Sequence, residues 1–135
     1  MTDIQPSGNN APRRLAMIVD DEPDMLSMLR LLLEKRCGCD VVAASSGLAA
    51  LELLGDCKPD LVITDIMMPE QDGTEVIMHI ESLDPRPPVL AISGGAPNVP
   101  AYMALHLARL KADATLMKPF RNEELRSKVD ALLKS

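Results

Sequence analysis

Five short apolar runs alternate with five stretches whose apolar residues recur at helical spacing, and this alternation constrains the fold most strongly. The expected strands are Leu15 to Val19, Val41 to Ala44, Leu61 to Ile63, Val89 to Ile92 and Ala114 to Met117. The expected helices lie within residues 25–33, 48–54, 76–83, 101–110 and 125–133. Parallel strands need crossover connections, usually helices, which cover both faces of their sheet. The pattern therefore predicts an α/β fold built on a five-stranded parallel sheet.

The length of 135 residues fits one domain, which we expect to occupy residues 14–135. Residues 1–13 are polar and contain two prolines and a glycine, so we expect them to form a flexible leader. They contain no apolar segment of the kind found in secretory signals. The uncharged stretch 87–108 is interrupted by prolines and glycines, which argues against membrane insertion.

Charge and aromatic content argue against nucleic-acid binding. The 14 Lys and Arg residues against 20 Asp and Glu residues give a net charge of -6, which repels phosphate backbones. Tyr102 and Phe120 are the only aromatic residues, so stacking platforms for bases are almost absent. The cysteines Cys37, Cys39 and Cys57 lack the spacing of a metal site, and we expect reduced thiols in a cytoplasmic protein.

Polar residues follow all five expected strands at the point where each strand ends, and after the second strand they are Ser45 and Ser46. Asp20 and Asp21 follow the first strand, Asp65 the third, Ser93 the fourth and Lys118 the fifth. Because ligands of open parallel sheets bind outside the carboxyl ends of the strands, we expect these five residues to share one site.

The residue types at this edge are typical of phosphoryl transfer. Three clustered carboxylates repel one another unless a cation compensates them, and a site with oxygen ligands alone favours Mg²⁺. Asp65, nearest the middle of the sheet, would be free to attack phosphorus and form an acyl phosphate. Lys118 would neutralise charge together with the metal, and the Ser93 hydroxyl would bind a phosphoryl oxygen.

Each residue also has a simpler interpretation when it is taken alone. Asp20 and Asp21 could cap the helix that follows Pro23, and Asp65 could form an Asx turn. Ser93 could belong to a glycine turn, and Lys118 could be a solvated charge. None of these interpretations explains why all of them fall at strand ends.

Five segments of the sequence resemble the receiver domains of two-component response regulators. They are IVDDEPD at 18–24, LVITD at 61–65 followed by MPEQDG at 68–73, AISGG at 91–95, and MKPF at 117–120. The resemblance covers about residues 15–133. It implies a flavodoxin-like fold with strand order 2-1-3-4-5 and five helices. It further implies that Lys118 and Pro119 are joined by a cis peptide bond.

The resemblance also implies roles for individual residues. Asp65 would accept a phosphoryl group from a sensor histidine kinase or a histidine phosphotransfer protein. Mg²⁺ would be held by Asp20, Asp21, Asp65 and the backbone carbonyl of Met67. Ser93 and Lys118 would sense the phosphoryl group.

The sequence departs from the family at the switch position, where Thr115 replaces the usual Tyr or Phe, so an aromatic switch is excluded there. In the family, the positions of Met67 and Gly95 influence how long the phosphoryl group lasts. Both residues are uncharged and could not position an attacking water, so the resemblance implies slow self-dephosphorylation. The expected helix at 101–110 has an unusually apolar outer face, which could be incidental surface apolarity or, where the family binds its targets, a surface for a downstream protein. A phosphorylation-dependent homodimer is a further expectation. That face consists of Ala101, Tyr102, Leu105 and Ala108.

We expect a stand-alone receiver that switches or relays through protein contacts and is not an enzyme. One alternative is a receiver-like scaffold that works without phosphorylation. Another is a Mg²⁺-dependent phosphohydrolase of the haloacid dehalogenase type, which is disfavoured because Met67 stands where that family has an acid. A dinucleotide-binding fold is disfavoured because the G-x-G-x-x-G motif is missing.

Overall fold

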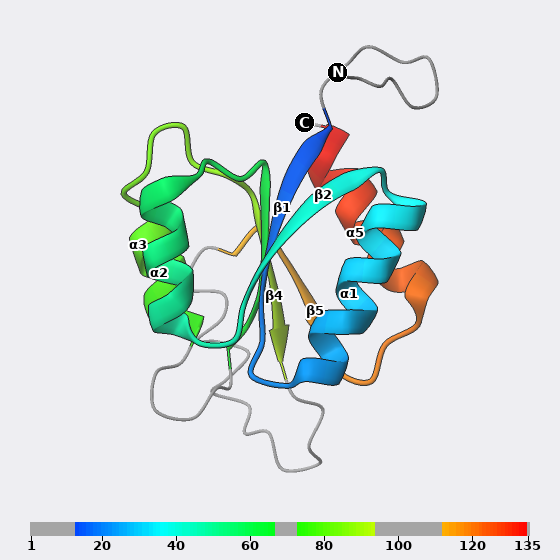
Figure 1. The fold of residues 1–135 in the computed structure, drawn as a ribbon. Helices are drawn as coiled ribbons and strands as arrows, with labels where there is room; N and C mark the ends of the chain where they lie inside the picture. Colours follow the sequence, from blue (N-terminus) through cyan, green and yellow to red (C-terminus); the bar gives the residue numbers. More distant parts are fainter. Residues whose placement is uncertain (1–12, 67–72, 94–111, 135) are drawn as a thin grey trace, which may run out of the picture.

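The computed structural model describes residues 13–66, 73–93 and 112–134, and its strands form one parallel sheet (Figure 1). The strand order is β2-β1-β3-β4-β5, as the resemblance implies. The strands are β1 (Arg14–Val19), β2 (Cys39–Ala44), β3 (Leu61–Asp65), β4 (Val89–Ser93) and β5 (Ala114–Met117). The helices of the described part are α1 (Pro23–Arg36), α2 (Gly47–Asp56), α3 (Gly73–Ile80) and α5 (Asn122–Lys134). The expected helix at 101–110 lies outside the described residues.

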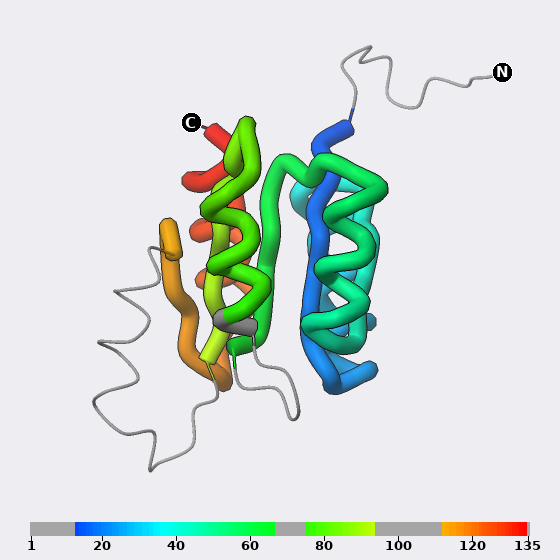
Figure 2. The backbone as a smooth tube through the Cα atoms, turned by 90° about the vertical axis from the view of Figure 1, so that its left-hand side faces the viewer, coloured from blue at the N-terminus to red at the C-terminus, as the bar shows by residue number. Residues whose placement is uncertain are grey.

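Two layers of helices enclose the sheet. Helices α1 and α5 cover one face, and α2 and α3 cover the other, as the two views show (Figures 1 and 2). Side chains alternate along β1 between the two faces, so Met17 and Val19 lie in the core under α2 and α3. Ala16 and Ile18 lie in the core under α1 and α5. Burial on both faces explains why the strands read as continuous apolar runs.

The carboxyl ends of the strands meet at one edge of the sheet, the lower edge in Figure 1. Parallel pairing places Asp65 beside Ile92 and Ser93 beside Met117. Backbone hydrogen bonding continues one residue beyond three strands, and the amide of Ile66 after β3 donates to the carbonyl of Ile92 at 3.0 Å. The amide of Asp20 donates to the carbonyl of Ala44 at 3.1 Å, and the amide of Lys118 donates to the carbonyl of Ser93 at 2.9 Å. This pairing fixes the backbone at the edge.

Local sequence signals set the ends of the first two helices. Proline at the first position of α1 restricts Glu22 to an extended backbone, with φ -96° and ψ 115°. Ser46 caps α2, because its hydroxyl accepts a hydrogen bond from the amide of Ala49 at 3.1 Å. Gly38 joins α1 to β2 with φ 67°, a left-handed conformation that favours glycine.

The peptide bond between Lys118 and Pro119 is cis, as the resemblance implies. The three cysteines are free: Cys39 is buried, and Cys37 and Cys57 are half-buried. Within the described ranges, no helix has the length and apolar character needed to cross a membrane.

Candidate functional site

The structure brings the predicted strand-end residues to the same edge of the sheet. Asp20 is fully buried, while Asp65 and Ser93 are only 4% and 5% exposed. Asp21 is exposed at the surface, and Lys118 is half-buried. Carboxylate oxygens of Asp20, Asp21 and Asp65 lie within 4.8 Å of one another. We call these three residues the acidic cluster.

The ammonium group of Lys118 lies over the acidic cluster and contacts three carboxylates. Its Nζ atom donates to Oδ2 of Asp65 at 3.0 Å, to Oε1 of Glu22 at 3.0 Å and to Oδ2 of Asp20 at 3.2 Å. Burial alone would lower the pKa of Lys118, but the hydrogen bonds to Asp65 and Glu22 outweigh it and raise that pKa above its ordinary value. Lys118 therefore stays charged and partly neutralises the acidic cluster.

Each carboxylate oxygen of Asp20 accepts a hydrogen bond. Its Oδ1 atom accepts a hydrogen bond from the amide of Glu22 at 2.9 Å, which leaves Oδ2 for Lys118. Burial, together with the nearby charge of Asp65, raises the pKa of Asp20 above its ordinary value, although the Glu22 amide opposes this shift. A buried carboxylate with a raised pKa, next to a second carboxylate, favours the approach of a cation.

The simpler interpretations explain only part of this geometry. Asp20 does accept an amide hydrogen bond just before α1, but the N-cap residue of that helix is Glu22, whose side chain makes no capping bond. Lys118 is not a solvated charge, because it forms three ion pairs. The turn expected after Asp65 lies outside the described residues.

Ser93 ends β4, between the ends of β3 and β5. Its side chain forms no hydrogen bond with the described part of the chain, although the residue is buried. A buried hydroxyl without a partner is costly, and a bound ligand oxygen would satisfy it. This observation fits a group that binds phosphoryl oxygen.

Of the remaining predicted positions, Thr115 is described by the structure and the others are not. Thr115 is exposed on β5 and pairs with Ala91 of β4. Six predicted residues lie outside the described ranges: Met67, Gly95, Ala101, Tyr102, Leu105 and Ala108.

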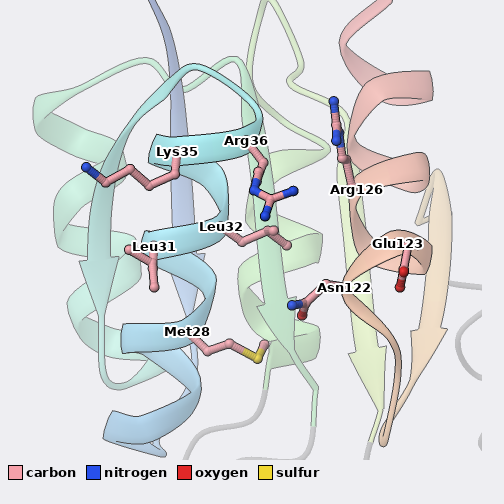
Figure 3. Close-up of a pocket in the computed structure, with 8 residues that line it drawn as sticks. All are labelled: Met28, Leu31, Leu32, Lys35, Arg36, Asn122, Glu123 and Arg126. Atoms are coloured by element: carbon pink, nitrogen blue, oxygen red, sulfur yellow. The ribbon is translucent and has the colours of Figure 1, made fainter.

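Sequence reasoning did not single out Glu22 or the hollow between α1 and α5. The signal for Glu22 was its place between Asp21 and Pro23, where an extended backbone next to the strand end is expected. The hollow measures about 500 Å³, and Figure 3 shows its lining side chains on the two helices. They are Met28, Leu31, Leu32, Lys35, Arg36, Asn122, Glu123 and Arg126.

The fold and the acidic cluster define a doubly wound α/β domain of the receiver type. The family model described as the response regulator receiver domain matches residues 16–130, and the chain belongs to this family.

Two curated relatives illustrate the similarity. The alkaline phosphatase synthesis transcriptional regulatory protein PhoP of Bacillus subtilis is 34% identical over 118 residues, which are 87% of this chain and 48% of that protein. The Regulator of RpoS of Escherichia coli K12 is 37% identical over 118 residues, 87% of this chain and 34% of that protein. The chain thus spans half or less of the length of these relatives.

Solved structures show the same fold. A putative response regulator from Chloroflexus aurantiacus has a TM-score of 0.81 and 26% identity, with 92% of this chain and all of that chain covered. A CheY-like receiver domain protein from Methanospirillum hungatei has a TM-score of 0.82 and 24% identity, with 91% and 95% covered. The receiver fold is therefore confirmed.

Proposed function

We propose that Asp65 is the phosphoacceptor of this receiver domain and takes its phosphoryl group from a sensor histidine kinase or a histidine phosphotransfer protein. The observation that carries the proposal is the setting of its carboxylate, which is nearly buried at the strand edge, beside Asp20 and Asp21 and 3.0 Å from the ammonium of Lys118. A cytoplasmic location accompanies this proposal and is supported by three free cysteines.

We propose Mg²⁺ as the cation of the acidic cluster. The donor set fits this ion, because it consists of hard carboxylate oxygens within 4.8 Å of one another. Asp20, Asp21 and Asp65 would hold it together with the backbone carbonyl of Met67. The bound ion would supply positive charge against the carboxylates and the phosphoryl oxygens.

The residues of the chain then have separate tasks in the transfer. A carboxylate oxygen of Asp65 attacks phosphorus, and the bond between phosphorus and the donor histidine nitrogen breaks, which leaves an acyl phosphate. Lys118 already lies within hydrogen-bond distance of the attacking carboxylate and can follow the new phosphoryl oxygens. The buried Ser93 hydroxyl can bind another of these oxygens.

Phosphorylation can drive a conformational switch through these contacts. A change from 1:99 to 99:1 in population requires about 5.5 kcal/mol of differential interaction. Two or three charge-assisted hydrogen bonds, each worth about 1.5 to 3 kcal/mol, can supply it. We propose that Ser93 and Lys118 make these bonds, that Thr115 occupies the switch position, and that the surface of Ala101, Tyr102, Leu105 and Ala108 contacts a downstream protein or a second copy.

Incubation with Mg²⁺ and acetyl phosphate, read by intact mass, tests the proposal. We expect the wild type to gain one phosphate and Asp65→Asn to gain none. Asp24→Asn is a matched control, because Asp24 is an exposed residue in the first turn of α1. Continuous hydrolysis of phosphomonoesters would instead support the phosphohydrolase alternative, and absence of phosphate from the wild type would contradict the proposal.

A further inference from the structure

Glu22 contacts the site through both its side chain and its backbone. Its Oε1 atom lies 3.0 Å from Nζ of Lys118, and its amide donates to Oδ1 of Asp20 at 2.9 Å. Its side chain is 62% exposed, whereas that of Asp20 is 1% exposed and that of Asp65 5%. Glu22 thus lies at the solvent-exposed side of the site, which we call its mouth, and is linked by hydrogen bonds to Lys118 and to the buried Asp20.

The ammonium of Lys118 has three N–H donors, and three carboxylates use them. Asp20 and Asp65 belong to the acidic cluster, and Glu22 does not. A cation bound to the acidic cluster competes with Lys118 for oxygens of Asp20 and Asp65, and it repels the ammonium because the charges are alike. Among the partners of Lys118 in the described ranges, Glu22 alone lies outside the acidic cluster, so such a cation leaves it available.

We propose that Glu22 is a positioning residue that keeps Lys118 at the mouth of the site when a divalent cation occupies the acidic cluster. This inference rests on the proposed function, because it assumes that the cluster binds Mg²⁺ and that Asp65 accepts phosphate. Glu22 holds the ammonium near Asp65, so that Lys118 reaches the phosphoryl oxygens without a search through other rotamers. The extended backbone that Pro23 imposes on Glu22 supports this role, since it fixes the Glu22 amide against Asp20.

A double-mutant cycle separates this role from a general charge effect. The variants are Glu22→Gln, Lys118→Met and the double variant, and Asp24→Asn controls for loss of one acidic charge on α1. The first measurement is the Mg²⁺ dissociation constant from calorimetry without a phosphodonor. We expect the Glu22→Gln change to weaken Mg²⁺ binding about two- to five-fold more in the wild-type background than in the Lys118→Met background.

The second measurement is the rate constant of phosphorylation by acetyl phosphate at saturating Mg²⁺ for each variant. We expect Glu22→Gln to lower it about two- to five-fold, Glu22→Asp to restore part of it, and Asp24→Asn to leave it unchanged. Circular dichroism melting checks that each variant folds, and Lys118→Gln replaces Lys118→Met if that variant does not.

The outcomes distinguish the two proposals. Equal weakening of Mg²⁺ binding in both backgrounds, with normal phosphorylation of Glu22→Gln, would overturn the role of Glu22 alone. The second outcome is that the wild type binds Mg²⁺ and the effects of the two substitutions on Mg²⁺ binding are non-additive, but the wild type accepts no phosphate. This outcome would overturn the phosphoacceptor proposal and leave the link between Glu22 and Lys118 standing.

Discussion

The ammonium of Lys118, directly after β5, lies 3.0 Å from Oδ2 of Asp65, the last residue of β3. These two strands are not neighbours, because β4 lies between them and ends at Ser93. The contact therefore crosses the end of β4 and joins three strand ends in one site. Its geometry leads to predictions about stability as well as about chemistry.

Loss of the ammonium should destabilise the metal-free protein. In Lys118→Met, the buried carboxylates of Asp20 and Asp65 would lose their shared cation. We expect the free energy of unfolding to fall by about 2 to 3 kcal/mol in EDTA, because uncompensated buried charges are costly. Millimolar Mg²⁺ should restore most of the loss, which urea unfolding with and without the metal would measure. Equal stability of both proteins in EDTA would contradict this account.

Removal of the Asp20 charge should have the opposite effect in EDTA. Burial raises the pKa of Asp20, so the folded state holds its proton more readily than the unfolded state, whose pKa is near 3.8. The stability contributed by this group is therefore fully present below about pH 3.8 and is lost as pH rises through the folded pKa.

Asp20→Asn cannot titrate, and we expect it to be more stable than the wild type at pH 7 in EDTA. The difference should shrink as pH falls below the folded pKa of Asp20. Urea unfolding across this pH range provides the measurement. A wild type that is more stable than Asp20→Asn in EDTA at pH 7 would show that the Lys118 contact outweighs the burial of Asp20.

The buried thiol of Cys39 should make the stability of the protein depend on pH, although it lies far from the acidic cluster. Burial, with a smaller effect of Cys37, raises the pKa of the Cys39 thiol from 9.0 to about 11. The unfolded state therefore loses this proton first, and the stability contributed by the group falls between pH 9 and 11. A shift of this size corresponds to about 2 to 3 kcal/mol.

Cys39→Val should lack this contribution, so its unfolding free energy should decline less steeply between pH 9 and 11 than that of the wild type. The other titratable groups are common to both proteins and, apart from Cys37, which interacts with Cys39, cancel in the difference. Parallel pH curves would show that Cys39 ionises as readily in the folded state as in the unfolded one.

Asp113 supports the opposite edge of the sheet. Its Oδ2 atom accepts hydrogen bonds from the amide of Val89 at 2.7 Å and from Nη1 of Arg86 at 2.9 Å. We expect Asp113→Ala to lower the free energy of unfolding by about 1 to 3 kcal/mol, because the Val89 amide loses its side-chain acceptor and the Arg86 guanidinium loses one of its acceptors. At a temperature where the variant is folded, its phosphorylation by acetyl phosphate should match that of the wild type. A large loss of phosphorylation would show that this edge is coupled to the site.

Much of the fold could be predicted because hydrophobic periodicity and strand ends are local features. The positions of Asp65 and Ser93 followed from the rule that parallel strands end at one edge. The start of β2 was placed too late, since Asp40 interrupts the apolar run. Asp40 is exposed on an edge strand and pairs with Arg13, so its polarity does not disturb the core.

The role of Glu22 could not be predicted from the sequence alone. Its contact with Lys118 depends on how far two side chains extend between the ends of β1 and β5, which lie on different parts of the sheet. The proline that follows Glu22 predicts its extended backbone, but nothing in the local pattern predicts that its side chain reaches Lys118. The hollow between α1 and α5 is likewise a product of helix packing.

Chemical mapping of the phosphorylated residue tests the central claim most directly. The protein is phosphorylated with acetyl phosphate and Mg²⁺, reduced with borohydride, which converts an aspartyl phosphate into homoserine, and digested for peptide mass mapping. We predict homoserine at position 65 in the wild type and in Asp24→Asn. Homoserine at another aspartate, or an unchanged Asp65 in a protein that has gained phosphate, would contradict the account.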